Sequence, residues 1–526
     1  MGRTAHRSHV ARYTPQIPTD KTDKTDRSLD SRTWGLVPAK PPRIRFPFRS
    51  QTVETQTGNQ RSSTKIHAAA VLLFALFPRA SGLQFSLDTF PVSYYTGLNG
   101  WHKGQECTIR RERTALSHNT CVHIACRCAS ESENSPMKTI RLKKNEERRV
   151  RKGHLWIYSN EVQSPLRDYE AGEVIDVTDF RGSFIGRGYI NPHSLICVRL
   201  LSFHQEQIDG SFFRRRIEKA HEYRHRVAAD RDAYRLIFSE GDFLPGLIID
   251  RYGDHFVVQT TTAGMDSRLE LVCEVLEDLL EPSAIVVRND AAIRQREDLL
   301  LYKKVVRGEI DGPVSIVSTD LTFEVDLWEG QKTGLYLDQW HNYGRLKGLL
   351  SGGPVLDCFC YSGGWALHAA HWGAARVRGV DSSEKGIGWA RRNAELNGVS
   401  EICQFEVGDA FDTLADLDRK GEHFDCVILD PPALVKSKSK MGEGLRGYRE
   451  INRRALKILS PSGILVTCSC SHHVDRETFL SVIRGAAAEA RRRVRLIECR
   501  TQAPDHPVLL SMPETEYLTC AFLEVL

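Results

Sequence analysis

Residues 353–381 read GPVLDCFCYSGGWALHAAHWGAARVRGVD, and this stretch decides the fold. Its apolar start predicts a strand that ends in Asp357. The pair Gly363–Gly364 predicts a tight turn into an amphipathic helix, and a second strand over residues 376–380 ends in Asp381. Such a unit can hold a nucleoside, because glycines let the backbone approach a ligand and an acid after the second strand can bind both ribose hydroxyls.

The loop of this unit reads DCFCYSGG over residues 357–364, with a carboxylate at its head. A dinucleotide fold has the pattern G-x-G-x-x-G instead, which packs its backbone against a pyrophosphate. A carboxylate at the head of the loop opposes a pyrophosphate and suits a cationic ligand. The loop resembles motif I of the class I S-adenosylmethionine (SAM) methyltransferases, and this resemblance implies SAM as the cofactor. An ordinary strand-to-helix turn is the alternative that one motif leaves open.

From residue 321 to the end, strands alternate with helices. This predicts an α/β fold, a Rossmann-like, doubly wound and mainly parallel sheet. Ligands bind beyond the carboxyl ends of the strands in such sheets. The five predicted strands are followed by polar or reactive residues, in chain order Asp357, Asp381, Asp409, Asp430 and the segment 468–471 (CSCS).

These strand ends suggest roles toward SAM. We expect Asp357 to face the cationic methionine part, Asp381 to bind the ribose hydroxyls, and Asp409 to accept from the adenine amino group. The predicted cofactor contacts are Asp357, Tyr361, Ser362, Gly363, Asp381, Ser382, Asp409, Ala410 and Asp430. Asn393 and Asn397 are expected only to cap the helix that follows Asp381.

The segment Asp430-Pro431-Pro432 bears on the reaction. Methylation of exocyclic base amines generally goes with such a segment followed by an aromatic residue, whereas Ala433 follows here. Cys470 indicates other chemistry, since a thiolate that adds to carbon 6 of a pyrimidine makes carbon 5 nucleophilic. We expect a positive pocket to keep this thiolate available near neutral pH. Cys470 and Asp430 are the predicted catalytic residues, and two buried core cysteines, Cys468 and Cys470, are the alternative.

Four regions are predicted along the 526 residues. Residues 1–136 are rich in Thr, Ser, Arg and Pro, with the near-repeat TDKTDKTD, which predicts a disordered extension. Met137 is the expected true start, and an organelle-targeting extension is the alternative. Residues 137–207 predict a compact β-rich domain, residues 208–320 a mixed α/β middle domain, and residues 321–526 the SAM-dependent domain. Within the middle domain we expect a basic helix over residues 211–230 and a hairpin turn over residues 250–254.

The start of the β-rich domain suits RNA, because basic residues lie close to aromatic ones that can stack on a base. A solvated charged edge is the alternative for this segment alone. The predicted RNA or substrate contacts in the whole chain are Lys143, Lys144, Arg148, Arg149, Lys152, Trp156, Lys332, Gln339, Pro431 and Lys436.

Composition narrows the class of protein. The 14 cysteines are diluted and many lie in apolar runs, which favours a reducing cytoplasm. No apolar run is long enough to span a membrane. Cys121, Cys126 and Cys128 lack a good zinc spacing, so we expect no metal. The formal net charge of +5 is too mild to indicate a partner.

Residues 137–526 together resemble the RlmI-like family of 23S ribosomal RNA methyltransferases, whose best-known activity is 5-methylation of a cytosine. The resemblance is carried by RLKKNEERRVRKGHLWIYSNEV, which looks like that family's PUA RNA-binding domain, and by GQKTGLYLDQWHN, DCFCYSGGWALHAA, GDAF, DPPALVKSK, TCSCSHH and DHPVLLSMPETEYLTCAFLEV. It implies 23S rRNA as the partner and Cys470 as the nucleophile. The chain departs from the family's usual D-Q-R, since Trp340 follows Gln339. We expect this difference to alter the grip on substrate or cofactor.

Other functions stay open. The same class of enzyme acting on another RNA atom is the nearest alternative, and an RNA-binding ribosome-assembly factor without catalysis is a different class. A small-molecule methyltransferase would not need the basic amino-terminal domain. The oligomeric state is open, with a homodimer as one assembly.

Overall fold

The computed structural model describes residues 137–526. The predictions of a disordered extension, of a true start at Met137 and of no metal at Cys121, Cys126 and Cys128 concern residues outside, or bordering on, this part of the chain. No helix in residues 137–526 is long and apolar enough to cross a membrane.

The first region of the described chain forms one five-stranded sheet with the order β1-β3-β4-β5-β2. Its elements are β1 (Thr139–Arg141), α1 (Glu147–Arg151), β2 (Trp156–Ile157), β3 (Val174–Thr178), β4 (Phe184–Ile190) and β5 (Val198–Ser202). Val177, Leu200 and other apolar residues of these strands are fully buried in a small core of their own. This core also includes Met512, more than 300 residues later in the chain.

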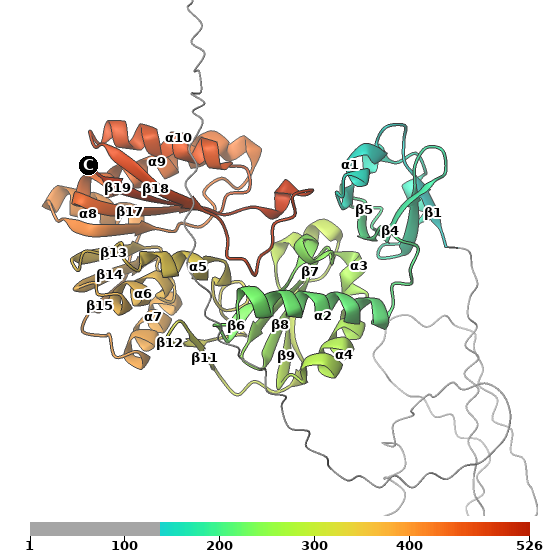
Figure 1. The fold of residues 1–526 in the computed structure, drawn as a ribbon, viewed down its shortest axis with the longest axis horizontal. Coiled ribbons are helices and arrows are strands. Elements are labelled where there is room, and N and C mark those ends of the chain that lie inside the picture. Colours follow the sequence, from blue (N-terminus) through green and yellow to red (C-terminus); the bar gives the residue numbers. More distant parts are fainter. Residues whose placement is uncertain (1–136) are drawn as a thin grey trace, which may run out of the picture. The chain divides into compact units, whose positions relative to one another are not determined.

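A second five-stranded sheet follows, with the order β10-β9-β8-β7-β6. Its elements are α2 (Gly210–Val227), β6 (Ala233–Phe238), β7 (Leu247–Tyr252), β8 (His255–Thr260), α3 (Ala263–Asp266), α4 (Leu269–Leu280), β9 (Ala284–Asn289) and β10 (Tyr302–Gly308). The apolar sides of α2 and α4 pack on this sheet through residues such as Phe213 and Leu276 (Figure 1).

Two local predictions in this region need correction. The basic helix ends at Val227 rather than at residue 230, because Ala228 leaves the helical conformation. The hairpin turn is shorter than predicted, since Tyr252 and His255 are paired and only Gly253 and Asp254 lie between the strands.

A two-stranded hairpin connects the middle region to the last one. It consists of β11 (Val314–Ser318) and β12 (Leu321–Val325), and Thr319 and Asp320 at its turn both have positive φ. Asn393 and Asn397 bind β12 rather than only capping their own helix: their side-chain oxygens accept from Glu324 N at 2.9 Å and from Thr322 N at 2.8 Å. The predicted domain boundary after residue 320 thus falls in a turn whose second strand is bound to the last region.

The last region confirms the predicted doubly wound, mainly parallel sheet. Its seven strands have the order β15-β14-β13-β16-β17-β19-β18. Six of them run in the same direction, and β19 runs in the opposite one. The strands are β13 (Pro354–Cys358), β14 (Arg376–Asp381), β15 (Cys403–Val407), β16 (Phe424–Leu429), β17 (Leu459–Ser469), β18 (Val494–Arg500) and β19 (Thr519–Val525). The helices are α5 (Trp340–Tyr343), α6 (Gly364–His371), α7 (Glu384–Leu396), α8 (Ala410–Lys420), α9 (Met441–Ile458) and α10 (Arg476–Glu489).

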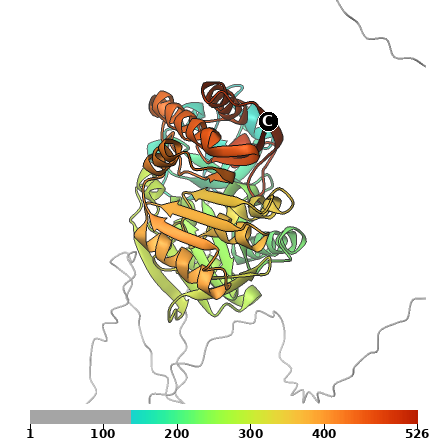
Figure 2. The same ribbon diagram turned by 90° about the vertical axis from the view of Figure 1, so that its left-hand side faces the viewer.

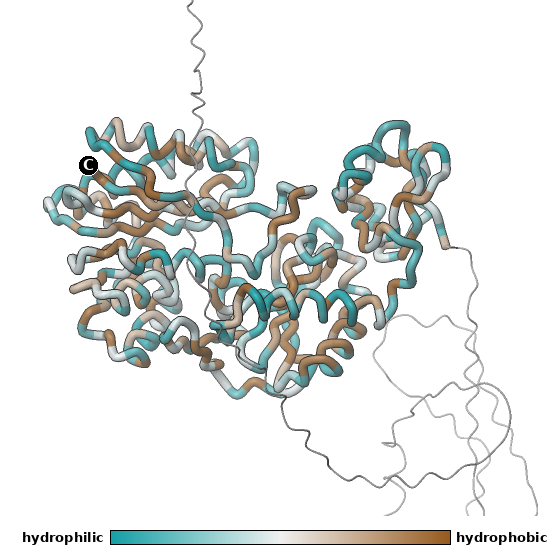
Figure 3. The backbone as a smooth tube through the Cα atoms, in the orientation of Figure 1, coloured by the Kyte–Doolittle hydropathy of each residue, from teal (hydrophilic) through white to brown (hydrophobic). Residues whose placement is uncertain are grey.

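Helices cover both faces of this sheet (Figure 1 and Figure 2). Residues of α6 and α7, such as Trp365 and Ile387, share one apolar cluster with the sheet. Residues of α8, α9 and α10, such as Leu414 and Tyr448, share the cluster on the other face. The central strands are correspondingly apolar along most of their length (Figure 3). Parallel strands buried on both faces bring the ends of β13, β14 and β16 to one edge of the sheet.

Candidate active site

Asp357, at the end of β13, is buried completely. Burial raises the pKa of Asp357 well above its usual value, and the nearby charge of Asp430 raises it further. The backbone N–H of Ala366 offsets part of this rise, although neither carboxylate oxygen makes a full hydrogen bond within residues 137–526. A buried carboxyl without a partner is costly, and a cation beside it would supply the missing interaction.

The loop after β13 is held in an unusual conformation by Asp381. Phe359, Tyr361 and Gly363 all have positive φ. Asp381 Oδ2 accepts a hydrogen bond from Tyr361 N at 2.9 Å, and Asp381 Oδ1 accepts one from Ser383 N at 2.8 Å. The half-buried Asp381 thus joins the loop to the start of α7, and each of its oxygens keeps a further lone pair for a ligand.

The other predicted cofactor residues lie around this loop in different surroundings. Ser362 is buried and its carbonyl accepts from Asn393 Nδ2 at 3.3 Å, whereas Ser382 is exposed. Asp409 is exposed and caps α8, since its Oδ1 accepts from Phe411 N at 2.8 Å. Ala410 is buried in the apolar cluster that α8, α9 and α10 share with the sheet. The cap is a role for Asp409 that the sequence analysis did not assign.

Residues 331–336, which precede the seven-stranded sheet in the chain, pack against the loop after β13. Tyr361 Oη accepts from Gln331 N at 2.8 Å, and the ring of Tyr336 lies edge-on to that of Tyr361 with centroids 5.4 Å apart. Lys332 lies over the ring of Tyr336, 4.5 Å from its centroid. The sequence analysis assigned no role to Tyr336, although it lies in the quoted segment GQKTGLYLDQWHN.

Asp430, directly after β16, is held by two donors on one oxygen. Gln339 Nε2 and Trp365 Nε1 each donate to Asp430 Oδ2 at 3.0 Å. The pKa of Asp430 is raised to about 6, because burial and the charge of Asp338 together outweigh the hydrogen bond from Trp365 and the charge of Lys332. Near neutral pH this carboxyl is therefore poised to exchange a proton. The sequence analysis assigned no role to Trp365, which lies in the helix predicted after Gly363–Gly364.

Cys470 lies just beyond the end of β17 and is half-buried. Its Sγ donates to the carbonyl oxygen of Pro431 at 3.7 Å, which places the thiol beside the segment that begins with Asp430. Burial, and then the charge of Asp430, raise the pKa of the Cys470 thiol to about 11 against the opposing charge of Lys332. The charge of Lys332 acts as the expected positive pocket should, but burial and Asp430 outweigh it in the protein without bound ligands, and an RNA-assisted thiolate stays a prediction. Cys468 is completely buried opposite Cys520, as a core cysteine.

Lys332 is not free, because Asp338 binds it. Lys332 Nζ lies 2.9 Å from Asp338 Oδ2, which also accepts from Tyr517 Oη at 2.6 Å. Burial alone would raise the pKa of Asp338, but the charges of Lys332 and His506 hold it well below its usual range. The pair thus keeps an ionised carboxylate and an ammonium group close to Asp430.

Comparisons with known proteins agree with this arrangement. A family model for a PUA-like domain matches residues 140–203, and one for S-adenosylmethionine-dependent methyltransferases matches residues 294–510. A "Ribosomal RNA large subunit methyltransferase I" of Tolumonas auensis is 37% identical over 386 residues, which cover 72% of this chain and 97% of that protein. The chain belongs to the ribosomal RNA large subunit methyltransferase I family. A protein with the same name from Klebsiella pneumoniae strain 342 is 37% identical over 382 residues, covering 72% and 96% of the two chains.

A solved structure supports the fold of this family member. SMU.776, described as a putative methyltransferase complexed with SAH, superposes with a TM-score of 0.65 at 19% identity, over 74% of this chain and 100% of that one. The predicted resemblance and the predicted combination of a PUA-like domain with a SAM-dependent domain are confirmed. No group of three or more His, Cys, Asp or Glu side chains in residues 137–526 is arranged to hold a metal ion.

Four predicted RNA contacts lie on the surface of the PUA-like domain. Lys143, Lys144, Arg148 and Lys152 are exposed. Arg149 and Trp156 already have protein partners: Arg149 pairs with Glu161 at 2.8 Å, and Trp156 Nε1 donates to Glu240 at 2.8 Å. Glu161 binds the guanidinium of Arg149 that we had assigned to RNA, whereas Glu240 binds only the indole N–H of Trp156, whose ring was the part expected to stack. All six contacts stay predictions.

Three further predicted contacts, Gln339, Pro431 and Lys436, belong to the last region of the chain. Gln339 is buried and both ends of its amide are used, since its Oε1 accepts from Asn342 Nδ2 at 2.7 Å. In the protein without ligands the amide of Gln339 therefore binds Asp430 and Asn342, and its contact with RNA stays a prediction. Pro431 is buried, and Lys436 is exposed.

Trp340, which follows Gln339, is a core residue in this family member. It is 5% exposed, and it packs edge-on to Phe323 and His368 with centroid distances of 5.2 and 5.5 Å. The side chain of Trp340 thus belongs to a hydrophobic core cluster. The expectation that an arginine missing at this position alters the grip on substrate or cofactor stays a prediction.

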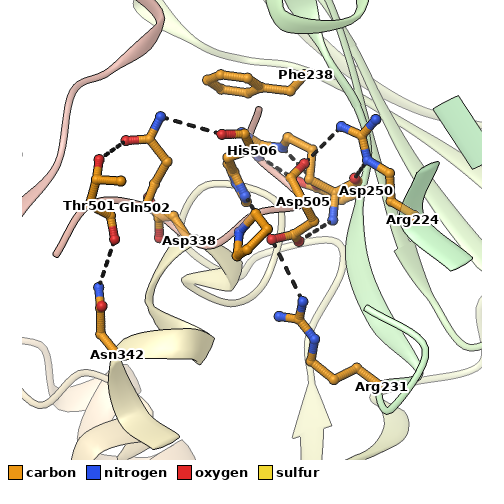
Figure 4. Close-up of polar contacts among 12 residues, drawn as sticks. Arg224, Arg231, Phe238, Asp250, Asp338, Asn342, Thr501, Gln502, Asp505 and His506 are labelled. Carbon is orange, nitrogen blue, oxygen red and sulfur yellow. Dashed lines mark hydrogen bonds and ion pairs between the residues drawn. The ribbon is translucent and has the colours of Figure 1, made fainter. Parts of the chain in front are cut away.

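The segment between β18 and β19, residues 501–518, is a strap that contacts the middle and last regions, as Figure 4 shows, and that places Met512 in the core of the first region. Asp505 Oδ2 accepts from Arg235 N in β6 at 2.9 Å, and Arg224 of α2 donates to Asp505 O at 2.7 Å. Ala503 N donates to Asp338 O at 2.8 Å. The strap thus connects the middle region to the residue that binds Lys332, a role that the motif DHPVLLSMPETEYL did not reveal.

Proposed function

We propose that the protein is a SAM-dependent ribosomal RNA methyltransferase that methylates carbon 5 of a cytosine in the large-subunit (23S) rRNA through a covalent adduct with Cys470. The relatives' names and the matched methyltransferase model support the class of reaction. One observation supports the assignment to carbon 5 of a cytosine. The half-buried thiol of Cys470 lies 3.7 Å from the carbonyl oxygen of Pro431, the residue that follows the catalytic candidate Asp430.

The residues at the strand ends fit SAM. Asp357 offers a buried carboxyl that lacks a full hydrogen bond, and Asp381 offers free lone pairs beside a loop with positive φ. We assign the cofactor to these two residues together with Tyr361, Ser362, Gly363, Ser382, Asp409, Ala410 and Asp430. When bound there, SAM supplies an electrophilic methyl group on a positively charged sulfur.

Asp430 is suited to the polar edge of a cytosine. Its Oδ2 is fixed by Gln339 and Trp365, so that Oδ1 remains for a base. With the pKa of Asp430 raised to about 6 by burial, the group can accept from the amino group or share a proton with the ring nitrogen.

Cys470 performs the covalent step in this proposal. Its thiolate forms a bond to carbon 6, which breaks the double bond between carbons 5 and 6 and makes carbon 5 nucleophilic. After carbon 5 has been methylated, a base takes the proton from carbon 5, the bond to Sγ breaks, and the ring double bond is restored. Because the thiol is protonated in the ligand-free protein, substrate binding has to assist its ionisation.

The exposed cations of the PUA-like domain would bind the phosphates of the rRNA. A cytoplasmic location, a homodimer and the absence of a metal remain predictions, as do the proposed domain boundaries.

One experiment tests this function. The full chain is incubated with unmodified 23S rRNA and SAM labelled in the methyl group, and the product is digested and mapped by mass spectrometry. We expect label at carbon 5 of one cytosine, and none with Cys470→Ala. RNA with 5-fluorocytidine at that position has no proton to lose from carbon 5, so it should remain attached to the wild-type protein in denaturing gels.

The same experiment separates the alternatives. Label on another atom, without a trapped complex, would favour the same class of enzyme with a different target. RNA binding and SAM binding without any label would favour a ribosome-assembly factor that has lost catalysis.

A further inference from the structure

The two serines on either side of Cys470 bind the same tyrosine. Tyr448 of α9 is completely buried, and its hydroxyl lies 3.1 Å from Ser469 Oγ and 2.9 Å from Ser471 Oγ. Both serines are 1% exposed. Since Ser469 donates to Tyr448, the phenol hydrogen is left to bind Ser471. One hydroxyl chain therefore spans the nucleophile on its inner side.

Cys470 lies on the opposite side of the chain from this tyrosine. Successive side chains of an extended segment alternate between two faces. Tyr448 belongs to the cluster on one face of the sheet, whereas Cys470 packs against the cluster on the other face and its thiol contacts Pro431 O. The serines thus fix the backbone, and the backbone directs Sγ toward Pro431.

The same helix also fixes the segment that contains Pro431. Val435 N donates to Ser471 Oγ at 3.1 Å. A Cβ on Gly444 of α9 would lie 2.4 Å from Val435 Cγ2 and 2.7 Å from Leu434 O, so the glycine permits a very close approach. Through Tyr448 and Gly444, α9 holds both the thiol and the carbonyl that it contacts.

We propose that Tyr448 is a positioning residue for the nucleophile: its hydroxyl binds Ser469 and Ser471 and thereby keeps Cys470 Sγ beside Pro431 O. This inference rests on the proposed function, in which Cys470 reacts with the base. The apolar ring of Tyr448 has a separate role in the core, where it packs edge-on to Phe479 with centroids 5.3 Å apart. Tyr448→Phe keeps the ring and removes only the hydroxyl, so it separates the two roles.

The test uses the full chain with Tyr448→Phe, and Tyr189→Phe as a matched control. Tyr189 is also buried and its hydroxyl donates to Pro245 O at 2.6 Å, but it lies in β4 of the PUA-like domain. We expect Tyr448→Phe to lower kcat by about tenfold or more, since small displacements of a reacting group are costly, with the KM for rRNA and the Kd for SAM within about twofold of wild type. Tyr189→Phe should leave kcat unchanged.

A second measurement needs no methyl transfer. The rate at which iodoacetamide alkylates Cys470, followed on its own peptide by mass spectrometry, should rise about threefold or more in Tyr448→Phe, because the freed segment opens more often. Ser469→Ala should give the same change and serves if Tyr448→Phe does not fold. An unchanged alkylation rate together with an unchanged kcat would overturn the proposal, even if the melting temperature falls. If wild type does not methylate carbon 5, the proposed function fails while the alkylation rate still decides the role of Tyr448.

Discussion

Gln339 Nε2 and Asp430 Oδ2 lie 3.0 Å apart, in a hydrogen bond between the segment that precedes the seven-stranded sheet and the end of its central strand β16. Trp365 Nε1 shares the same acceptor atom. The carboxylate is thus fixed in direction by two neutral donors, while burial makes its charge expensive. This combination of fixed geometry and raised pKa is typical of a group that works on a substrate.

The pKa of Asp430 leads to a prediction about stability. Its folded value of about 6 exceeds the unfolded value of about 3.9, so ionising it costs stability as the pH rises through this interval. Asp430→Asn should raise the free energy of unfolding by roughly 1–3 kcal/mol at pH 7.5 and give little gain at pH 4. Thermal melting at both pH values measures this. An equal gain at pH 4 would show that the charge of Asp430 is not the cause.

The pKa of Cys470 leads to a prediction about reactivity. Burial, and then Asp430, raise the pKa of this thiol to about 11. Its alkylation by iodoacetamide in the ligand-free protein should therefore increase about tenfold per pH unit between pH 7 and 9.5, because only the thiolate reacts. Asp430→Asn should speed the reaction at pH 8 by removing a neighbouring negative charge. A rate that levels off below pH 9 would contradict the burial argument.

Asp381 gives a prediction about cofactor binding. Asp381→Ala should weaken SAM binding by about 1–3 kcal/mol, the scale for removing a charged hydrogen-bonding partner. Isothermal titration measures the Kd, with Asp416→Ala as the control. Asp416 is a carboxylate of α8 that pairs with Lys420 at 2.7 Å and has no assigned ligand. Equal dissociation constants for wild type and Asp381→Ala would remove the ribose assignment.

The PUA-like domain gives a prediction about RNA binding. The double variant Lys144→Ala/Lys152→Ala removes two exposed cations. It should weaken rRNA binding and reduce the slope of log K against log salt by about 1–2, since each phosphate contact contributes a little under one. Filter binding at several salt concentrations measures this. Arg419→Ala/Lys420→Ala, at the end of α8, is the control, and equal slopes for both variants would argue against this surface.

Met512 gives a prediction about the strap. It is completely buried in the core of the PUA-like domain, whereas Leu510, two residues earlier, is 98% exposed. Met512→Ala should destabilise this domain by about 2–5 kcal/mol, the usual cost of truncating a buried methionine. Hydrogen exchange at Leu155 and Ile157, in the same core, should become faster. Leu510→Ala should leave exchange unchanged, and equal protection in both variants would mean that the strap does not support the domain.

Much of the site could be predicted because its signals are local. The strand ends at Asp357, Asp381 and Asp430 follow directly from apolar runs that stop at an acid, and each lies at the same edge of the sheet. Cys470 was found in the same way, at the end of a fifth run.

The residues that were missed or misassigned depend on distant partners. Trp365 had no assigned role, and it donates to Asp430, 65 residues away. Trp156 looked like a platform for a base and binds Glu240, 84 residues away. Periodicity reports only which side of an element is apolar, so it does not reveal which buried polar groups meet.

The sequence by itself determined the alternating strands and helices of the last region, the glycine-containing loop after β13, and the identity of the acids and the thiol, because hydrophobic periodicity and turn residues act over a few positions. Only the tertiary structure decided the chemical state of those groups. Burial raises the pKa of Cys470 to about 11 and that of Asp430 to about 6, and burial exists only once the chain has folded. The strap, residues 501–518, likewise acquires its role only when folding brings Asp505 to Arg235 and Tyr517 to Asp338.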